Sequence, residues 1–349
     1  MYKFGIWRSD ALTPSKTVLG RSRQYSYSLL KTLTSTPADL ERFETVIRNV
    51  RHSSGVCRTT YRSRLDDLDA LVQRVLERAF PSDRALELHD LGASDGLLSI
   101  DWAERVRAAF PQSRMTASDL ILYFTEAVWK SGETYILEPG GKPIQYIRPP
   151  FVVSIDIPES PVYPLNVLAR ALGRRLLRDL SSCCGDVRWD GVPDDRVIRH
   201  GGWTFRQIPL VHPVALSCVR SGHFRMIQAD AFSPLPGKYD VVRAMNLYQP
   251  SVFSPSRIHE GLRVALNSLV DGGILIAGRT IEREGRRNDV SISQKTGGRA
   301  RVLEHLGRGF EFEDYVTTYQ YNPNAMPEKS PLPHPGAKLA VERSNGPAS

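Results

Sequence analysis

The stretch from residue 85 to residue 110 constrains the fold most, because a strand pattern, a glycine turn and a helix pattern come directly one after another. Residues 85–91 form a run typical of a buried strand, and residues 92–96 read Gly-Ala-Ser-Asp-Gly. Apolar side chains then recur at helical spacing over residues 97–110. A strand, a tight turn and a helix in this order begin a βαβ unit, which predicts a parallel sheet.

The alternation of strands and helices continues farther along the chain. A second strand that ends on an acid is expected at residues 114–119, and Ser254-Pro255 has the form of a helix start. Further strands are expected at residues 224–230, 239–246 and 274–278. The pattern predicts an α/β fold, with helices on both faces of a mostly parallel sheet and a ligand at the carboxyl ends of its strands.

Residues 120–222 interrupt this alternation, because a crossover helix needs far fewer positions. We expect a large insertion after the second strand, with a hairpin around residues 138–142. A helix is expected at residues 165–180, where arginines lie beside a leucine-rich face. A membrane-surface anchor is one interpretation of that helix, and we favour a lid.

The two ends of the chain have different patterns from the centre. Residues 1–83 predict a helical extension that packs on the α/β core, and one of its helices begins at Thr36-Pro37. Residues 321–349 are rich in proline and poor in large apolar groups, which predicts a disordered tail. The α/β core is therefore expected at residues 84–119 and 223–320.

Composition excludes several other classes of protein. The 349 residues are 41% hydrophobic, without a window of about eighteen apolar residues and without the apolar core of a secretory signal in the first residues. We therefore expect a cytoplasmic protein with no transmembrane segment. The cysteines show no metal-ligand spacing and predict free thiols and no metal site; they are Cys57, Cys183, Cys184 and Cys218.

The net charge of +8 comes from the amino-terminal segment. Residues 1–64 hold twelve Lys and Arg against four Asp and Glu, so the remainder of the chain is neutral. The basic residues are dispersed instead of forming a run of five to eight, which favours a solvated basic surface over a dedicated polyanion site. We expect a small-molecule substrate and no nucleic-acid partner, and the pattern does not define an oligomeric state.

The segment Asp90-Leu91-Gly92-Ala93-Ser94-Asp95-Gly96 resembles motif I of the class I S-adenosylmethionine-dependent methyltransferases, with Ser94 in place of the usual middle glycine. Further segments resemble this family in the same order along the chain: Asp119, Asp230-Ala231-Phe232, residues 239–246 and residues 272–276. The resemblance covers about 130 positions. It implies the Rossmann-like class I methyltransferase sheet, with S-adenosyl-L-methionine as cofactor.

A sulfonium cofactor carries no phosphate, so its site needs close backbone approach and acceptors for its ammonium, ribose and adenine groups. The resemblance implies that Asp119 binds the ribose hydroxyls and that the loop at Asp230 contacts adenine. Asp90 is expected to face the ammonium; the bland alternative is that each of the three acids caps a helix or a turn. The full set of expected cofactor-binding residues is Asp90, Gly92, Ser94, Gly96, Asp119, Asp230, Ala231 and Phe232.

The resemblance places the substrate over the cofactor, between the loop after the fourth strand and the insertion. Methyl transfer needs positioning and often aromatic faces that tolerate a cation. Most aromatic candidates are expected to be core or cross-strand pairs, with only one or two near the sulfonium. The candidate catalytic residues are Asn246, Tyr248, Tyr146, Trp129 and Tyr163.

These residues support three enzymatic hypotheses. The leading one is methyl transfer from S-adenosylmethionine to an oxygen or nitrogen of a small molecule. A second is an enzyme of the azetidine-2-carboxylate synthase type, which cyclises the aminobutyrate part of the cofactor and releases methylthioadenosine. An RNA methyltransferase is the third. The alternative to all three enzymes is a non-catalytic scaffold of the same fold. In each enzyme the insertion is expected to form a cap that determines the substrate, whereas the core holds the cofactor.

Overall fold

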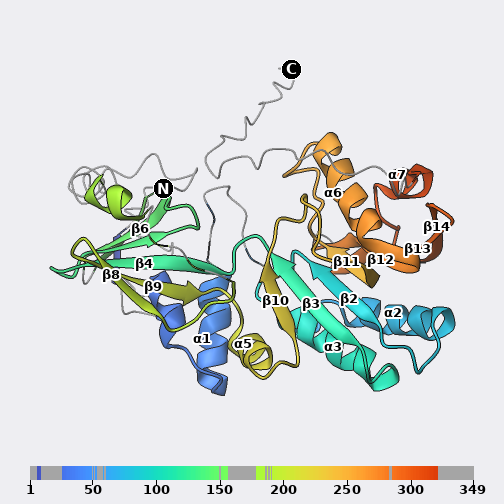
Figure 1. Cartoon of the computed structure of the whole chain (residues 1–349), viewed down its shortest axis with the longest axis horizontal. Helices are drawn as coiled ribbons and strands as arrows, with labels where there is room; N and C mark the ends of the chain where they lie inside the picture. The colour runs from blue at the N-terminus through green and yellow to red at the C-terminus, as the bar shows by residue number, and fades with distance from the viewer. Residues whose placement is uncertain are drawn as a thin grey trace.

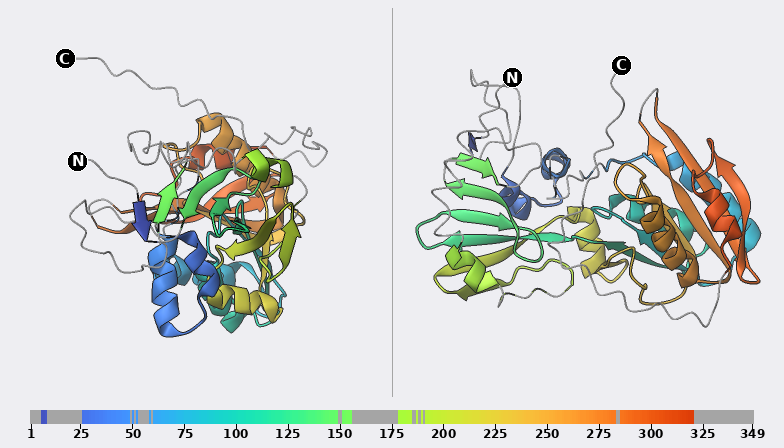
Figure 2. Two further views of the ribbon diagram at one scale, coloured as in Figure 1. Left: turned by 90° about the vertical axis from the view of Figure 1, so that its left-hand side faces the viewer. Right: turned by 90° about the horizontal axis from the view of Figure 1, so that it is seen from above.

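The computed structural model describes residues 6–8, 26–155 and 178–320, apart from short gaps at 49, 51, 53–57, 59, 149–150, 185–186, 188, 190 and 283–284. Two seven-stranded sheets lie beside each other along the longest axis of the molecule (Figure 1). Figure 2 shows the same division from two further directions. One sheet is the expected α/β core, and the other is built mainly by the insertion.

The core sheet has the strand order β10-β3-β2-β11-β12-β13-β14. The first five strands are parallel, and the last two run antiparallel to their neighbours. The strands are β2 (Glu87–Leu91), β3 (Arg114–Asp119), β10 (Arg225–Gln228), β11 (Tyr239–Met245), β12 (Leu269–Ile281), β13 (Arg287–Thr296) and β14 (Arg299–Leu306). The chain reverses its direction of winding between β2 and β11, which is where ligands bind in doubly wound sheets.

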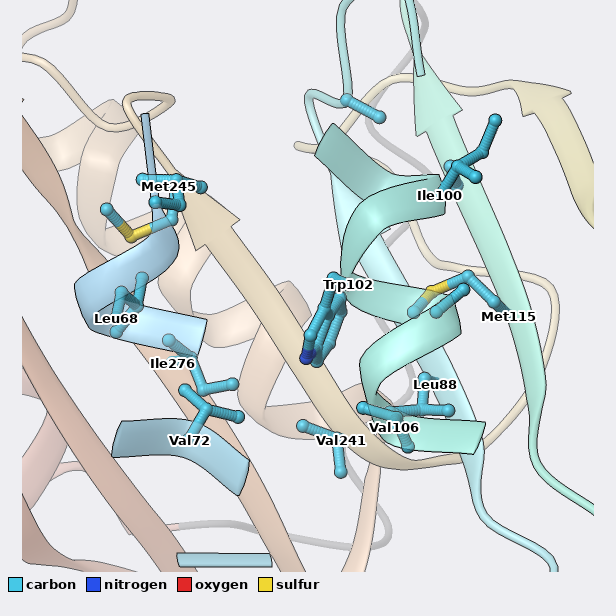
Figure 3. Close-up of a cluster of buried hydrophobic side chains, with 14 of the residues drawn as sticks. Leu68, Val72, Leu88, Ile100, Trp102, Val106, Met115, Val241, Met245 and Ile276 are labelled. Carbon is cyan, nitrogen blue, oxygen red and sulfur yellow. The ribbon is translucent and has the colours of Figure 1, made fainter. Parts of the chain in front are cut away.

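Helices cover both faces of this sheet. On one face, α2 (Asp66–Ala79) and α3 (Leu97–Ala109) pack on Val241 and Ile276, with Trp102 fully buried between them (Figure 3). On the other face, α6 (Pro255–Ser268) and α7 (Glu313–Thr318) pack on the neighbouring positions of the same strands, such as Val242. Adjacent strand residues are therefore both buried, as in a sheet covered on two sides. The predicted α/β fold class is confirmed.

The second sheet is antiparallel throughout, in the order β1-β7-β6-β5-β4-β9-β8. It follows directly from the core, because β4 begins four residues after the end of β3. The expected hairpin is formed by β5 and β6. The strands are β1 (Ile6–Arg8), β4 (Tyr123–Trp129), β5 (Thr134–Leu137), β6 (Pro143–Arg148), β7 (Phe151–Ser154), β8 (Val197–His200) and β9 (Trp203–Pro209). We call this the insertion sheet; α5 (Pro213–Arg220) follows it and contacts α3.

The amino-terminal part is divided between the two sheets, where the sequence predicted a single helical extension. The helix α1 (Pro37–Ile47) begins as expected, with the Thr36 side chain accepting a hydrogen bond from the Asp39 N–H at 3.3 Å. However, α1 and the 3-10 helix η1 (Tyr27–Thr32) bury their apolar side chains against the insertion sheet, and β1 pairs with its edge strand β7. Of the helices described in this part of the chain, α2 packs on the core. The insertion sheet supplies the apolar partner that these short helices need.

Several expectations concern residues outside the described part of the chain. They include Tyr163, Cys57, the tail at 321–349 and all but the last residues of the helix expected at 165–180; of this region, residues 178–184 are helical. Cys183, Cys184 and Cys218 are free, partly buried thiols. Among the described residues, no helix combines the length and the apolar character needed to cross a membrane, and no cluster of His, Cys, Asp or Glu could hold a metal ion.

Candidate functional site

The glycine turn between β2 and α3 is tightly packed. Gly92, Ser94 and Gly96 all have left-handed backbone conformations, with φ of +67°, +58° and +82°. A Cβ atom at Gly92 would lie 3.2 Å from Leu247 Cδ1, and one at Gly96 would lie 3.2 Å from Met226 Sδ. The backbone conformation therefore favours glycine at both positions, and the close side chains leave little room for a Cβ atom. Ser94 adopts the same region at a cost of about 1 kcal/mol, so its neighbours must hold it there.

Asp119 holds Ser94 in this conformation. Asp119 Oδ2 accepts a hydrogen bond from the Ser94 N–H at 2.8 Å, and Asp119 Oδ1 accepts one from the Ile121 N–H at 3.2 Å. Arg58 Nη2 lies 2.9 Å from the same Oδ1. A carboxylate offers about four acceptor positions, so the three donors leave room for one further hydrogen bond. The expected ribose acceptor, Asp119, thus lies beside the glycine turn, and it already accepts a hydrogen bond from Arg58.

Arg58 was not among the candidate site residues. Its side chain is only 5% exposed, and it also donates to the Ser94 carbonyl oxygen at 2.8 Å and to the Ile121 carbonyl oxygen. Arg58 Nε lies 3.4 Å from His52 Nε2, and His52 Nδ1 lies 3.7 Å from a carboxylate oxygen of Glu138. A chain of polar side chains therefore connects the insertion sheet with the glycine turn.

The segment that carries Arg58 continues across the carboxyl ends of the core strands. Arg64 pairs with Glu282 just after β12, and Asn288 on β13 donates to Asp67 at 2.6 Å. Arg64 is 9% exposed. The expectation of a solvated basic surface is therefore wrong for Arg58 and Arg64, because acceptors at the strand ends hold both guanidinium groups. The signal available in the sequence was the surplus of arginine itself, which did not show which arginines turn inward.

Asp90 forms a buried ion pair. Arg243 Nε donates to Asp90 Oδ1 at 3.0 Å, and Ser99 Oγ donates to Oδ2 at 2.6 Å. Arg243 also binds Asp69 on α2 at 3.0 Å and lies 4.2 Å from the ring centroid of Trp102. Asp90 and Arg243 are 4% and 1% exposed. The expectation that Asp90 faces a ligand ammonium is wrong: its carboxylate turns into the core, where it neutralises a buried guanidinium.

Asp230 lies just after β10, beside the end of β3. Its Oδ1 accepts from the Phe232 N–H at 3.0 Å, and its Oδ2 lies 3.3 Å from Ser233 Oγ and 3.7 Å from Arg257 Nη2. The first contact shows that Asp230 caps its own turn, which was the alternative to a role in ligand binding. The two longer contacts on Oδ2 leave that oxygen able to accept a further donor. Ala231 and Phe232 are each 9% exposed and belong mainly to the core.

An open hollow of about 540 Å³ lies at the ends of these two strands. Its walls include Leu120, directly after Asp119, as well as Ala229 and Asp230 at the end of β10. Leu120 is 59% exposed, although it is a large apolar side chain. The Ala229 N–H donates to the Asp119 carbonyl oxygen at 3.1 Å, so the two acids are carried by adjacent backbone segments. The structure therefore places Asp230 in the wall of this hollow, and Asp119 directly before the wall residue Leu120.

Asn246 and Tyr248, after β11, are occupied by internal hydrogen bonds. Asn246 has a φ of +58°, and its Oδ1 accepts from the Thr280 N–H at 2.7 Å. The Tyr248 hydroxyl donates to the Gly261 carbonyl oxygen at 3.0 Å, and the side chain is 3% exposed. Burial raises the pKa of Tyr248 above its ordinary value, which favours the protonated hydroxyl. The structure thus assigns Tyr248 to the core under α6.

Trp129 and Tyr146 lie in the insertion sheet, away from the core strand ends. Trp129 pairs across strands with Trp203 at a centroid distance of 4.8 Å, and Tyr146 pairs with Tyr135 at 5.0 Å. Trp129 is the last residue of β4, about 20 Å along that strand from its start at Tyr123. The structure does not bring these two candidate catalytic residues to the site. They are cross-strand pairs, the outcome expected for most of the aromatic candidates.

The candidate site combines a glycine turn at a topological switch point with acids at two adjacent strand ends. No protein-family model and no curated protein matches the chain. Among solved structures, it is similar to the sugar N-methyltransferase KedS8 from Streptoalloteichus sp ATCC 53650, with 15% identity and a TM-score of 0.26, over 71% of this chain and 74% of that chain.

Two other solved structures show likenesses of the same strength. The mitomycin 7-O-methyltransferase MmcR is 14% identical, with a TM-score of 0.27, over 74% of this chain and 44% of that chain. The [4+2]-cyclase SpnF is 16% identical, with a TM-score of 0.27, over 65% of this chain and 49% of that chain. At these TM-scores the likenesses carry no weight for fold or function, which rest on the geometry of the chain itself.

Proposed function

We propose that this protein is an S-adenosylmethionine-dependent transferase of the class I methyltransferase type, which methylates an oxygen or nitrogen of a small molecule. The observation that carries the proposal is the hollow beside Asp119, which is apolar at Leu120 and acidic at Asp230. It lies at the carboxyl ends of two parallel strands. Asp119, at the end of one of them, accepts a hydrogen bond from the glycine turn, which has three left-handed residues. This is the arrangement in which doubly wound sheets bind nucleosides.

The residues fit the adenosyl part of the cofactor. The remaining acceptor position of Asp119 suits a ribose hydroxyl, and an apolar hollow of this size suits a purine base. Asp230 Oδ2 provides an acceptor for the exocyclic amine of adenine. Neither group needs a cation, which agrees with a cofactor that carries no phosphate.

The residues fit the amino-acid part of the cofactor less fully. Asp90 is enclosed with Arg243 and cannot reach the ammonium group. The turn at Gly92, Ser94 and Gly96 remains the part of this chain that would lie along the methionine portion. When bound, the cofactor supplies an electrophilic methyl group on its sulfonium. Tyr248 is a hydrogen-bonded core residue, so the proposal assigns it no proton transfer.

The reaction is tested by incubating the purified protein with S-adenosylmethionine, with and without a panel of small phenols, amines and sugars. The proposal predicts S-adenosylhomocysteine only when an acceptor is added. Asp119→Asn should reduce its formation, whereas Asp66→Asn, in an exposed pair with Arg105 on α3, should not. Methylthioadenosine formed from the cofactor alone above the spontaneous rate would instead establish the cyclising hypothesis. If no mixture yields either product, the proposed transfer is wrong.

A further inference from the structure

Trp189 brings a side chain of the insertion to the hollow that the core strands form. It lines the hollow together with Leu120 and Asp230, although its position in the chain lies in the insertion, between β7 and β8. Its ring packs against two apolar clusters, one in the core around α3 and one in the insertion sheet around Trp203. Both parts of the molecule therefore fix the position of the indole.

The indole is suited to stacking on a flat base. Its nitrogen Nε1 is buried and has no hydrogen-bond partner among the described residues, although the side chain lines the hollow. The guanidinium of Arg196 lies 5.8 Å from the centroid of the ring. Leu120 is 59% exposed, which leaves apolar surface available on another wall. The hollow is also lined by Gly191 and by residues of β10, which is the edge strand of the core sheet. An aromatic ring and an aliphatic side chain around one hollow are surfaces on which purines stack.

We propose that Trp189 and Leu120 enclose the adenine base of the cofactor, with Trp189 as an adenine-binding residue supplied by the insertion. This inference rests on the proposed function, because it names the group that occupies the hollow. It also differs from the expectation from the sequence, in which the insertion determines the substrate and only the core binds the cofactor. Here the insertion contributes to cofactor affinity, while Asp230 selects a base with an exocyclic amine.

The experiment measures binding of S-adenosylhomocysteine and of adenosine to the full chain by calorimetry and by tryptophan fluorescence. Trp189→Ala should weaken binding of both ligands about tenfold, the usual scale for losing one stacking partner, whereas Trp189→Phe should stay within about threefold of wild type. Ligand binding should change the fluorescence of the wild-type protein. The change should vanish in Trp189→Phe and persist in Trp129→Phe, because Trp129 lies at the far end of β4.

The outcomes separate this inference from the proposed function. Suppose that S-adenosylhomocysteine binds the wild-type protein, that Asp119→Asn weakens this binding and that Trp189→Ala does not change it. The proposed site is then supported, and the role given to Trp189 is wrong. A fluorescence change that persists in Trp189→Phe would lead to the same conclusion. If S-adenosylhomocysteine does not bind wild type at all, the proposed function fails. Equal binding of inosine and adenosine would contradict the role given to Asp230.

Discussion

The guanidinium of Arg58 lies 2.9 Å from the carboxylate of Asp119, in a pair that joins the amino-terminal segment to the end of β3. The side chains of Arg58 and Asp119 are only 5% and 17% exposed. Arg58 also donates to the backbone carbonyl groups of Ser94 and Ile121, so one side chain connects the glycine turn with the start of the insertion. The same carboxylate is the proposed ribose acceptor, so the proposal makes the pair both a structural link and part of the ligand site.

Because the pair is largely buried, its two members should depend on each other for stability. Arg58→Met leaves Asp119 with two backbone donors and no cation, and Asp119→Asn leaves Arg58 buried without a carboxylate. We expect the two losses in the free energy of unfolding to be non-additive, with a coupling energy of about 1–3 kcal/mol. Urea denaturation of the two single variants and the double variant measures it. Strictly additive losses would show that the pair makes no net contribution.

Stability should fall in mild acid because His212 is buried without charge. Burial lowers the pKa of His212 to about 4, whereas the unfolded chain protonates it near 6.5. The unfolded state therefore binds more protons below pH 6.5, and the free energy of unfolding decreases as the pH falls towards 4. His89 has the same sign and a similar pKa, about 4, for the same reason.

The variant His212→Asn isolates this contribution. His212 Nδ1 accepts a hydrogen bond from the Val214 N–H at 3.3 Å at the start of α5, and an asparagine oxygen can accept the same bond. Between pH 6.5 and 5, the variant should lose about 1.5 kcal/mol less stability than wild type, because the full slope of about 1.4 kcal/mol per pH unit is reached only when the unfolded histidine is mostly protonated. Chemical denaturation at the two pH values measures the difference. Parallel losses in both proteins would contradict the assignment.

Asp90→Asn should reduce stability and leave cofactor affinity unchanged. The substitution removes one of the two carboxylates that neutralise Arg243, so we expect a loss of about 3 kcal/mol. Asp66→Asn is the control, because its exposed pair with Arg105 should contribute less than about 1 kcal/mol. Thermal unfolding and calorimetry with S-adenosylhomocysteine give the two readouts. If Asp90→Asn were folded and fully stable but bound S-adenosylhomocysteine tenfold more weakly, Asp90 would be a ligand-binding residue after all.

Trp129→Phe and Tyr146→Phe should keep turnover and cofactor affinity within about twofold of wild type. Both side chains form aromatic pairs inside the insertion sheet, and phenylalanine retains most of that packing. Steady-state kinetics with an accepted substrate measures both quantities. A tenfold fall in turnover with unchanged folding would restore the role that the sequence suggested for them.

The core could be predicted from the sequence because its signals are local. The strand over residues 114–119, the helix after Ser254 and the glycine turn depend on patterns a few residues long. The partners of the charged groups could not be predicted in this way. Asp90 and Arg243 are 153 positions apart, and Arg58 and Asp119 are 61 positions apart. Which acid faces a ligand and which neutralises an arginine depends on pairings that only the folded chain brings together.

The packing of the amino-terminal segment could not be predicted either, because it too depends on contacts between residues far apart in the sequence. The apolar spacing of α1 predicted a helix correctly, but did not show that its face would lie on the insertion sheet. Trp189 likewise stands in a stretch with no periodic pattern, and its contacts come from two sheets. A long insertion that builds its own sheet creates surfaces that local patterns do not describe.

Cofactor binding at Asp119 is tested most directly by calorimetric titration of the wild-type protein and of Asp119→Asn with S-adenosylhomocysteine at fixed ionic strength. We predict one site per chain in wild type and at least tenfold weaker binding in the folded variant, because a charged acceptor for the ribose is lost. Binding of equal strength to both proteins, or no binding to wild type, would contradict the proposed site.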